Sequence, residues 1–339
     1  MKKILIFKTD RIGDFVNFSP CLRILKNNFV DCHITMVCSK YNYQIAKNYK
    51  EIDKIVIIKK NLFLEIFFFL KNFFLTNYDY LFQFDGNKRS YILSCFVSAK
   101  IRSALFFYKN INLFGINYKH IRPNFFLRFF FNNSIFCNED YSANNITAHY
   151  QTLYLKLLEN LNFKINYKQN VFYLDTSFKN EFSSFFNETN KSYYLFHIDE
   201  KSNTLNSSQF DSLLDLVDKI KIKQNIVLSL GIGQFIYESK IKEKFNILDY
   251  SIKNNSFKID DSNVLCLKNL PLNLLAYFIA NSDANISMHS GSIVHISAAF
   301  NKLIIDIIEE HKFKELDRWI PLESKYKRFD LNKLENFTI

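Results

Sequence analysis

MKKILIFKTDRIGD, residues 1–14, is the stretch that decides the fold, because an apolar run of strand type passes directly into a charged turn. The turn holds four charged residues and a glycine: Lys8, Asp10, Arg11, Gly13 and Asp14. In a parallel α/β sheet, such a turn places a carboxylate at the carboxyl edge of the sheet, where ligands bind. Asp is also a favoured helix N-cap, and capping is the ordinary interpretation of an isolated Gly-Asp pair. Four charges exceed what a cap requires, so Asp14 is a candidate general base.

The composition is typical of a reduced protein with two α/β domains. A chain of 339 residues is long enough for two domains, and its 48% hydrophobic residues can give each a core. The six cysteines are scattered, with no Cys-x-x-Cys pair and no Cys/His spacing suited to zinc. The first residues lack the pattern of a signal peptide. We therefore expect reduced thiols and a cytoplasmic location.

The net charge indicates anionic partners, and two Phe-rich stretches raise the question of membrane contact. The formal net charge is +11, which favours phospholipid, lipopolysaccharide cores or nucleic acid as partners. The Phe-rich stretches 62–75 and 125–136 are interrupted by charges and fall short of the ~20 apolar residues of a membrane span. Each stretch can pack against a sheet or lie on a membrane as an amphipathic helix. No nucleic-acid-binding motif is present, so we expect no nucleic-acid partner.

Strand-like runs alternate with helical patterns along most of the chain. In the first half the strand-like runs are residues 4–7, 33–37, 54–58 and 78–84. Residues 162–191 carry few periodic apolar positions, which indicates a crossing between domains. A second alternation follows, from residue 193 to residue 308. This pattern predicts βαβ units and parallel sheets, in two doubly wound domains with boundaries at 1–165 and 166–339.

A second polar turn of the first domain follows the strand-like run 78–84. It contains Gly86 and then Lys88 and Arg89. These two cations can project toward anionic groups above the same sheet edge, or they can belong to a solvated loop.

Two turns of the second domain suit a phosphate. Lys201 follows a strand-like run and can pair with a pyrophosphate, although it can equally be an ordinary surface lysine. The small residues Ser290, Gly291 and Ser292 begin a helix, where backbone N–H groups and the helix dipole favour a phosphate. His295 lies inside that helix, as a packed histidine or as a ligand contact.

These four turns, in this order and at these separations, resemble the bacterial heptosyltransferase family, glycosyltransferase family 9. The resemblance covers nearly the whole chain and is clearest at residues 8–14 with Pro20, at residues 78–90 and at residues 270–299. It implies the GT-B fold, in which two Rossmann-like, doubly wound domains face a central cleft. The first domain would bind the acceptor and the second the nucleotide-sugar donor.

By this resemblance, Asp14 would be the catalytic base of an inverting transfer, taking the proton of the acceptor hydroxyl as that oxygen attacks the anomeric carbon. The implied acceptor-binding residues are Lys8, Asp10, Arg11, Gly13, Lys88 and Arg89. The implied donor-binding residues are Lys201, Ser290, Gly291, Ser292, His295 and Glu238, the last in place of a ribose-binding acid. No metal and no cofactor are expected, and the expected donor is ADP-heptose.

The implied function is transfer of a sugar, heptose in the first instance, to a lipopolysaccharide core or other surface-glycan acceptor. A glycolipid acceptor would bring the protein into peripheral contact with the cytoplasmic face of the inner membrane. The donor loop departs from the family pattern, because His289 or Ser290 stands where the family carries an acid and one residue is added between Gly291 and His295. The alternative is therefore a GT-B-like protein that binds a nucleotide sugar and has lost transfer.

Overall fold

The computed structural model describes the chain apart from residues 60, 114–115, 123–124, 140–148, 186–191, 234, 251–262 and 338–339. The described residues form two compact units. Unit 1 comprises Met1–Tyr173 and the short returning segment Asp317–Leu322, and unit 2 comprises Leu174–Leu316 and Glu323–Ile339. The chain thus leaves unit 1 a few residues beyond the expected boundary at 165 and enters it once more near its end.

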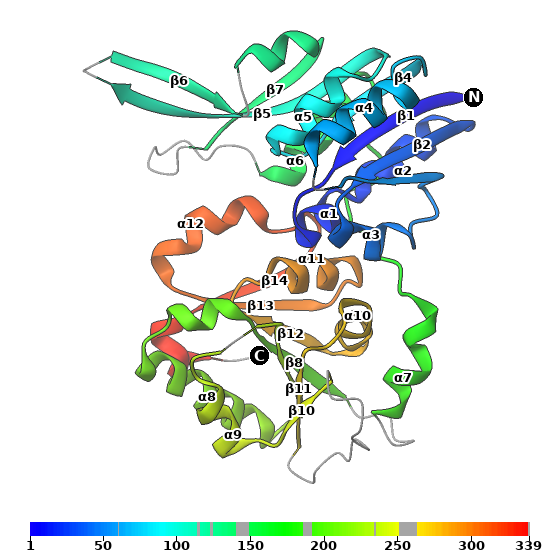
Figure 1. The fold of residues 1–339 in the computed structure, drawn as a ribbon. Coiled ribbons are helices and arrows are strands. Elements are labelled where there is room, and N and C mark those ends of the chain that lie inside the picture. Colours follow the sequence, from blue (N-terminus) through cyan, green and yellow to red (C-terminus); the bar gives the residue numbers. More distant parts are fainter. Residues whose placement is uncertain are drawn as a thin grey trace. The chain divides into compact units, whose positions relative to one another are not determined.

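Unit 1 is built on one sheet with the strand order β3-β2-β1-β4-β5-β6, and β7 pairs with β5 (Figure 1). The strands are β1 (Lys2–Lys8), β2 (Cys32–Cys38), β3 (Lys54–Ile57), β4 (Tyr78–Gln83), β5 (Ala99–Leu113), β6 (Ile116–Arg122) and β7 (Asn133–Asn138). The described pairings are parallel except that of β5 with β6. The helices are α1 (Ile12–Phe18), α2 (Pro20–Asn28), α3 (Lys40–Ala46), α4 (Leu62–Phe73), α5 (Lys88–Cys95), the 3-10 helix η1 (Phe125–Phe130) and α6 (Tyr150–Glu159).

β1 occupies the centre of this sheet because it is apolar on both faces. Ile4, Leu5, Ile6 and Phe7 have no solvent exposure, as befits a strand covered by helices on both sides. β1 pairs with β2 on one side and β4 on the other. The chain order reverses between β1 and β4, which makes the carboxyl ends of these two strands the topological switch point.

Unit 2 has a second sheet, with the order β10-β11-β9-β8-β12-β13-β14, and its described pairings are all parallel. Its strands are β8 (Tyr193–Ile198), β9 (Asn225–Leu230), β10 (Ile247–Asp249), β11 (Val264–Lys268), β12 (Ala284–Ser287), β13 (Leu303–Ile308) and β14 (Lys325–Asp330). Its helices include α7 (Lys179–Ser184), α8 (Ser207–Lys221), α9 (Glu238–Lys244), α10 (Leu272–Asn281), α11 (Gly291–Ala299) and α12 (Phe313–Leu316), with the 3-10 turns η3 (Glu200–Thr204) and η6 (Leu331–Asn336). Here the switch point lies between β8 and β12.

The prediction of two doubly wound α/β domains is confirmed, because each unit has a largely or wholly parallel sheet with a switch point near its centre. A cleft between the domains stays a prediction. None of the helices in the described parts of the chain is long and apolar enough to span a bilayer.

Candidate active site

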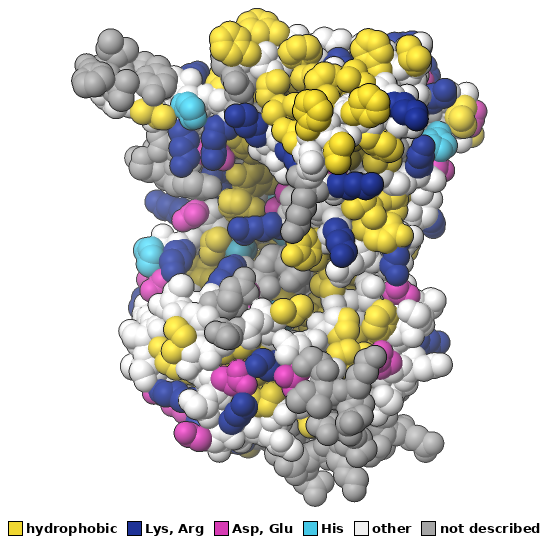
Figure 2. Space-filling view, viewed as in Figure 1, with side chains coloured by type: hydrophobic (Ala, Val, Ile, Leu, Met, Phe, Trp, Pro, Cys, Tyr) yellow, Lys and Arg dark blue, Asp and Glu magenta, His cyan; other side chains and the backbone are white. Residues whose placement is uncertain are grey.

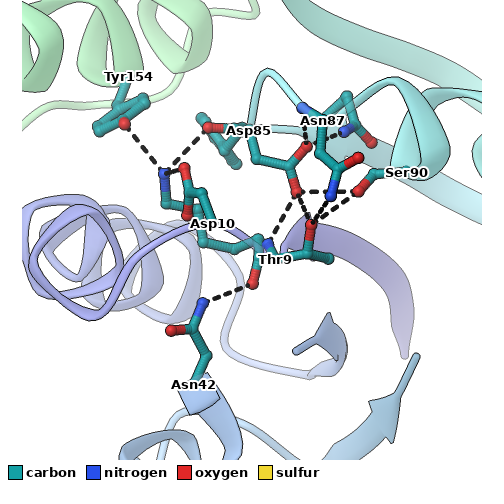
Figure 3. Close-up of polar contacts among 10 residues, drawn as sticks. Thr9, Asp10, Asn42, Asp85, Asn87, Ser90 and Tyr154 are labelled. Atoms are coloured by element: carbon teal, nitrogen blue, oxygen red, sulfur yellow. Dashed lines mark hydrogen bonds and ion pairs between the residues drawn. The ribbon is translucent and has the colours of Figure 1, made fainter. Parts of the chain in front are cut away.

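A buried carboxylate joins the two turns at the switch point of unit 1. Asp85 follows β4 and is 1% exposed. Its Oδ2 accepts hydrogen bonds from the backbone N–H of Thr9 (2.8 Å), the Thr9 hydroxyl (2.7 Å) and the Ser90 hydroxyl (3.1 Å) (Figure 3). Its Oδ1 accepts from the Gln83 amide (2.7 Å) and the Asn87 backbone (3.0 Å). Five donors replace the water that this carboxylate loses on burial, so it can hold the turns together.

Lys8, at the end of β1, is a buried structural cation. Its ammonium group has no exposure and donates to Asp10 Oδ2 (2.7 Å), the Phe84 carbonyl (3.1 Å) and the Tyr154 hydroxyl (2.9 Å), the last from α6. The three N–H donors of a lysine are thereby all used. The prediction that Lys8 binds the acceptor is wrong for this reason: its side chain positions Asp10.

Asp10 has two further carboxylates, Asp14 and Asp85, in its neighbourhood. Burial, together with the carboxylates of Asp14 and Asp85, raises the pKa of Asp10 to about 8, although Lys8 acts in the opposite direction. Burial alone would lower the pKa of Lys8, but Asp10 and Asp14 outweigh it and raise that pKa. One ammonium group thus faces several carboxyl groups, and Asp10 retains a proton near neutral pH.

Asp14 is the uncommitted carboxylate of this cluster. It lies half-buried in the first turn of α1, and its side chain makes no hydrogen bond or ion pair with any residue that the structure describes. The N-cap of α1 is Arg11 and has no side-chain capping bond, so the capping interpretation of Asp14 is wrong. Arg11 is exposed at the same turn, whereas Gly13 is buried. Its carboxylate is therefore not committed to a structural hydrogen bond within the described residues and can accept one from a ligand.

Lys88 and Arg89, the two cations that follow β4, lie in different surroundings. Arg89 turns to α4, where its Nη2 lies 2.6 Å and its Nε 3.0 Å from Glu65 Oε2. The prediction that Arg89 projects over the sheet edge is therefore wrong, since its guanidinium is held by a buried carboxylate. Lys88, at the first position of α5, is exposed and can still reach a ligand.

Two predicted donor-site features do meet at the switch point of unit 2. Asp199, just past β8, accepts a hydrogen bond from the backbone N–H of Lys201 (3.0 Å), and the Lys201 ammonium donates to the His289 carbonyl. α11 begins at Gly291, and its N-cap Ser290 makes no side-chain capping bond. An ammonium group thus lies beside an uncapped helix N-terminus, an arrangement that attracts phosphate.

A buried network beneath this loop was not predicted. Asp306 of β13 has no exposure and accepts hydrogen bonds from the Ser287 hydroxyl (3.0 Å), the His289 backbone N–H (3.2 Å) and the Tyr326 hydroxyl (2.7 Å), and it pairs with the His289 ring. His289 has a φ of +56°, so the loop turns sharply here. The single acid within the apolar run Leu303–Ile308 was the sequence signal that could have revealed it.

The remaining two donor-site predictions fall on residues with other roles. His295 is 1% exposed within α11, which favours the interpretation as a packed histidine. Glu238, at the start of α9, receives hydrogen bonds from Lys268 (2.7 Å) and is paired with Lys242 (3.0 Å), and these bonds lower the pKa of its carboxyl. Glu238 is thus committed to lysines rather than poised for a ribose.

No protein-family model matches this sequence, and no curated protein sequence does. Solved structures do match over nearly the whole chain. A glycosyltransferase of family 9 from Veillonella parvula superposes with a TM-score of 0.70 at 14% identity, covering 97% of this chain and 86% of its own. The E. coli heptosyltransferase WaaC with ADP gives 0.64 at 15% identity, covering 99% and 96%. E. coli ADP-heptose lps heptosyltransferase II gives 0.64 at 13% identity, covering 97% and 90%.

At these identities the likeness establishes the fold, which is that of the GT-B glycosyltransferases. A UDP-GlcNAc 2-epimerase from Methanocaldococcus jannaschii also matches, with a lower TM-score of 0.54 at 12% identity and covering 98% of this chain and 90% of its own. Because one fold carries both kinds of chemistry, the activity must be argued from the residues at the two sheet edges.

Proposed function

We propose that this protein is an inverting glycosyltransferase of the family 9 type, which transfers a sugar, heptose in the first instance, from ADP-heptose to a lipopolysaccharide core or other surface-glycan acceptor. The observation that carries the proposal is the uncommitted Asp14 carboxylate at the switch point of unit 1. The higher TM-scores of the family 9 glycosyltransferase and the heptosyltransferases favour transfer over epimerisation.

In the proposed reaction, Asp14 takes the proton of an acceptor hydroxyl while that oxygen forms a bond to the anomeric carbon of the donor. The bond between the anomeric carbon and the diphosphate breaks at the same time, and the nucleoside diphosphate leaves with the electron pair. Attack from the face opposite the leaving group inverts the anomeric configuration. Among the cations predicted to bind the acceptor, Arg11 and Lys88 are exposed and can bind an anionic group.

The leaving group gains negative charge, and unit 2 supplies groups that suit it. Lys201 and the backbone N–H groups at the start of α11, near Ser290 and Ser292, are donors of the kind that stabilise a developing charge. A Cβ at Gly291 would meet no atom within 4 Å, so there is open space beside this helix end. We propose that these groups, without a metal ion, receive the donor diphosphate.

The altered donor loop supports a second candidate, a protein that binds a nucleotide sugar without transferring it. By the resemblance, His289 or Ser290 stands where the family carries an acid, and the His289 ring pairs with the buried Asp306. A binding protein has no need of the free Asp14 carboxylate, and this is why transfer is our first proposal.

The test compares the parent with an Asp14→Asn variant. We expect turnover with a nucleotide sugar, as transfer or slow donor hydrolysis, to fall roughly 100-fold to 10,000-fold when the base is removed. Thermal stabilisation by the same donor should be unchanged, because Asp14 lies in unit 1. Asp215→Asn, an exposed carboxylate on α8, is the matched control.

Donors are chosen by thermal shift with ADP-, UDP-, GDP- and CMP-sugars. Equal turnover by parent and Asp14→Asn would contradict the assignment of the base. Stabilisation by a nucleotide sugar without turnover, over a wide panel of acceptors, would favour the binding protein instead. We further propose that the enzyme works in the cytoplasm at the inner membrane, where a glycolipid acceptor would lie.

A further inference from the structure

The outer face of α4 is apolar, although a helix on a protein surface ordinarily presents polar residues to solvent. The inner stripe of α4 is conventional: Phe69 and Phe73 are buried and stack on one another, and Phe69 also stacks on Phe7 of β1. The outer stripe is unusual, because it presents aromatic side chains to solvent: Phe63 is 81% exposed and Phe67 is 68% exposed. The sheet therefore explains only one face of this helix.

The exposed apolar residues continue onto η1, and both α4 and η1 pack against α5. We define the aromatic patch by its members, which are Phe63, Leu64, Phe67, Phe74, Leu75, Phe126, Phe129 and Phe130, each at least half exposed. Figure 2 shows hydrophobic side chains gathered over this part of unit 1, with Lys and Arg side chains at their margin. Contiguous exposed apolar areas on soluble proteins mark interaction surfaces.

The chain segment that carries the aromatic patch is strongly positive. Residues 59–136 contain eleven Lys and Arg but three Asp and Glu, and so carry eight of the eleven excess positive charges of the chain. Two of those acids, Glu65 and Asp85, are buried, and the third, Asp79, pairs with Lys100 at 2.9 Å. The charge that this segment presents to solvent is therefore almost purely cationic.

Cations also lie within the aromatic patch itself. Lys71 is exposed on α4, and the guanidinium of Arg128 lies 5.5 Å from the ring centroid of Phe129 and 5.9 Å from that of Phe136. Aromatic rings with Lys and Arg beside them are typical of surfaces that enter the interface between lipid headgroups and acyl chains.

We propose that the aromatic patch docks unit 1 onto a bilayer surface rich in anionic phospholipid. Apolar side chains would enter the headgroup boundary, and the cations would pair with lipid phosphates. A second copy of the chain is a poor occupant, because it would bring two strongly cationic segments together. The inference deepens the proposed location at the inner membrane by naming the surface that would bind it, and it does not rest on the proposed transfer.

Within unit 1 the helix that carries part of the aromatic patch is connected to the buried carboxylate Asp85 by a short path. Glu65 of α4 holds Arg89 of α5, and the next residue of α5, Ser90, bonds to Asp85. A membrane-docked α4 would thus be linked to the turn after β1 through the Glu65–Arg89 ion pair and the hydrogen bonds of Asp85 with Ser90 and Thr9.

The test is vesicle co-sedimentation of the full chain without donor or acceptor. The parent is expected to bind vesicles that contain phosphatidylglycerol and to bind pure phosphatidylcholine far more weakly. A double variant, Phe63→Ser with Phe67→Ser, should lose roughly 100-fold in partition, since two exposed rings no longer enter the lipid. The matched control is Val30→Ser with Ile222→Ser, two exposed apolar residues outside the aromatic patch, which should bind as the parent does.

A Lys71→Glu variant tests the charge, and its binding should fall roughly tenfold and depend less on salt. Equal binding by parent and double variant, or no binding of the parent to anionic vesicles, would overturn the proposal. So would a lipid-free parent that sediments as a dimer while the double variant sediments as a monomer, because the aromatic patch would then belong to a second copy. Turnover of soluble substrates is measured separately, so a failure here is distinguishable from a failure of the proposed transfer.

Discussion

In unit 1 the candidate site lies where β1 and β4 end, and in unit 2 it lies where β8 and β12 end, so both lie at a switch point of a doubly wound sheet. Unit 1 fills this position with carboxylates, of which Asp14 is uncommitted and Asp10 holds a proton to about pH 8. Unit 2 buries its carboxylate, Asp306, beneath the loop and leaves Lys201 and a helix N-terminus at the edge. The same topology thus carries a carboxylate without a hydrogen-bond partner in one unit, and an ammonium group beside an uncapped helix N-terminus in the other.

The largest effect, a loss of folding stability, should come from removing the Lys8 ammonium group from the carboxylate-rich sheet edge of unit 1. Lys8→Met would leave three acceptors, on Asp10, Phe84 and Tyr154, without their donor, and we expect unfolding free energy to fall by about 3–5 kcal/mol, measured in urea at neutral pH. Lys2→Met, on the same strand but half exposed, is the control and should cost less than ~1 kcal/mol. A loss from Lys8→Met as small as that of the control would show that the cluster does not depend on this cation.

The next prediction concerns the affinity of unit 2 for the nucleoside diphosphate, which can be measured without proton transfer. Lys201→Met should weaken the binding of a nucleoside diphosphate about tenfold, equivalent to ~1.4 kcal/mol, because one charged partner of the phosphate is lost. Titration calorimetry measures it, with Lys219→Met on α8 as the control. If both variants bound alike, the phosphate would not lie at the start of α11.

The smallest expected effect is a change of kcat/KM with pH. Burial and the neighbouring carboxylates raise the pKa of Asp10 to about 8, so its proton is lost as the pH rises through that value. The added negative charge attracts the proton that leaves the acceptor hydroxyl, and we expect kcat/KM to increase roughly threefold to fivefold across this step. Asp10→Asn, which cannot titrate, should remove the step from the pH profile. A profile that kept it would assign the step to another group.

Much of the fold could be predicted from the sequence, because alternating strand and helix patterns are local. The run of residues 1–14 placed Asp14 at a sheet edge, and the small residues of 290–292 placed a helix start at another. Whether a given charge is available for a ligand could not be predicted. Lys8 meets Tyr154 from 146 positions away and Arg89 meets Glu65 from 24, and no local pattern records such encounters.

By itself the sequence determined two doubly wound sheets and the positions of the charged turns, since hydrophobic periodicity decides which strands are buried and where they end. The tertiary structure alone decided which of those charges were left free. Burial withdraws a charge from water, and a buried charge must find partners from any part of the chain. Lys8, Arg89 and Asp306 found theirs and became structural, whereas Asp14 found no hydrogen-bond or ion-pair partner among the described residues, and for this reason we propose it as the base.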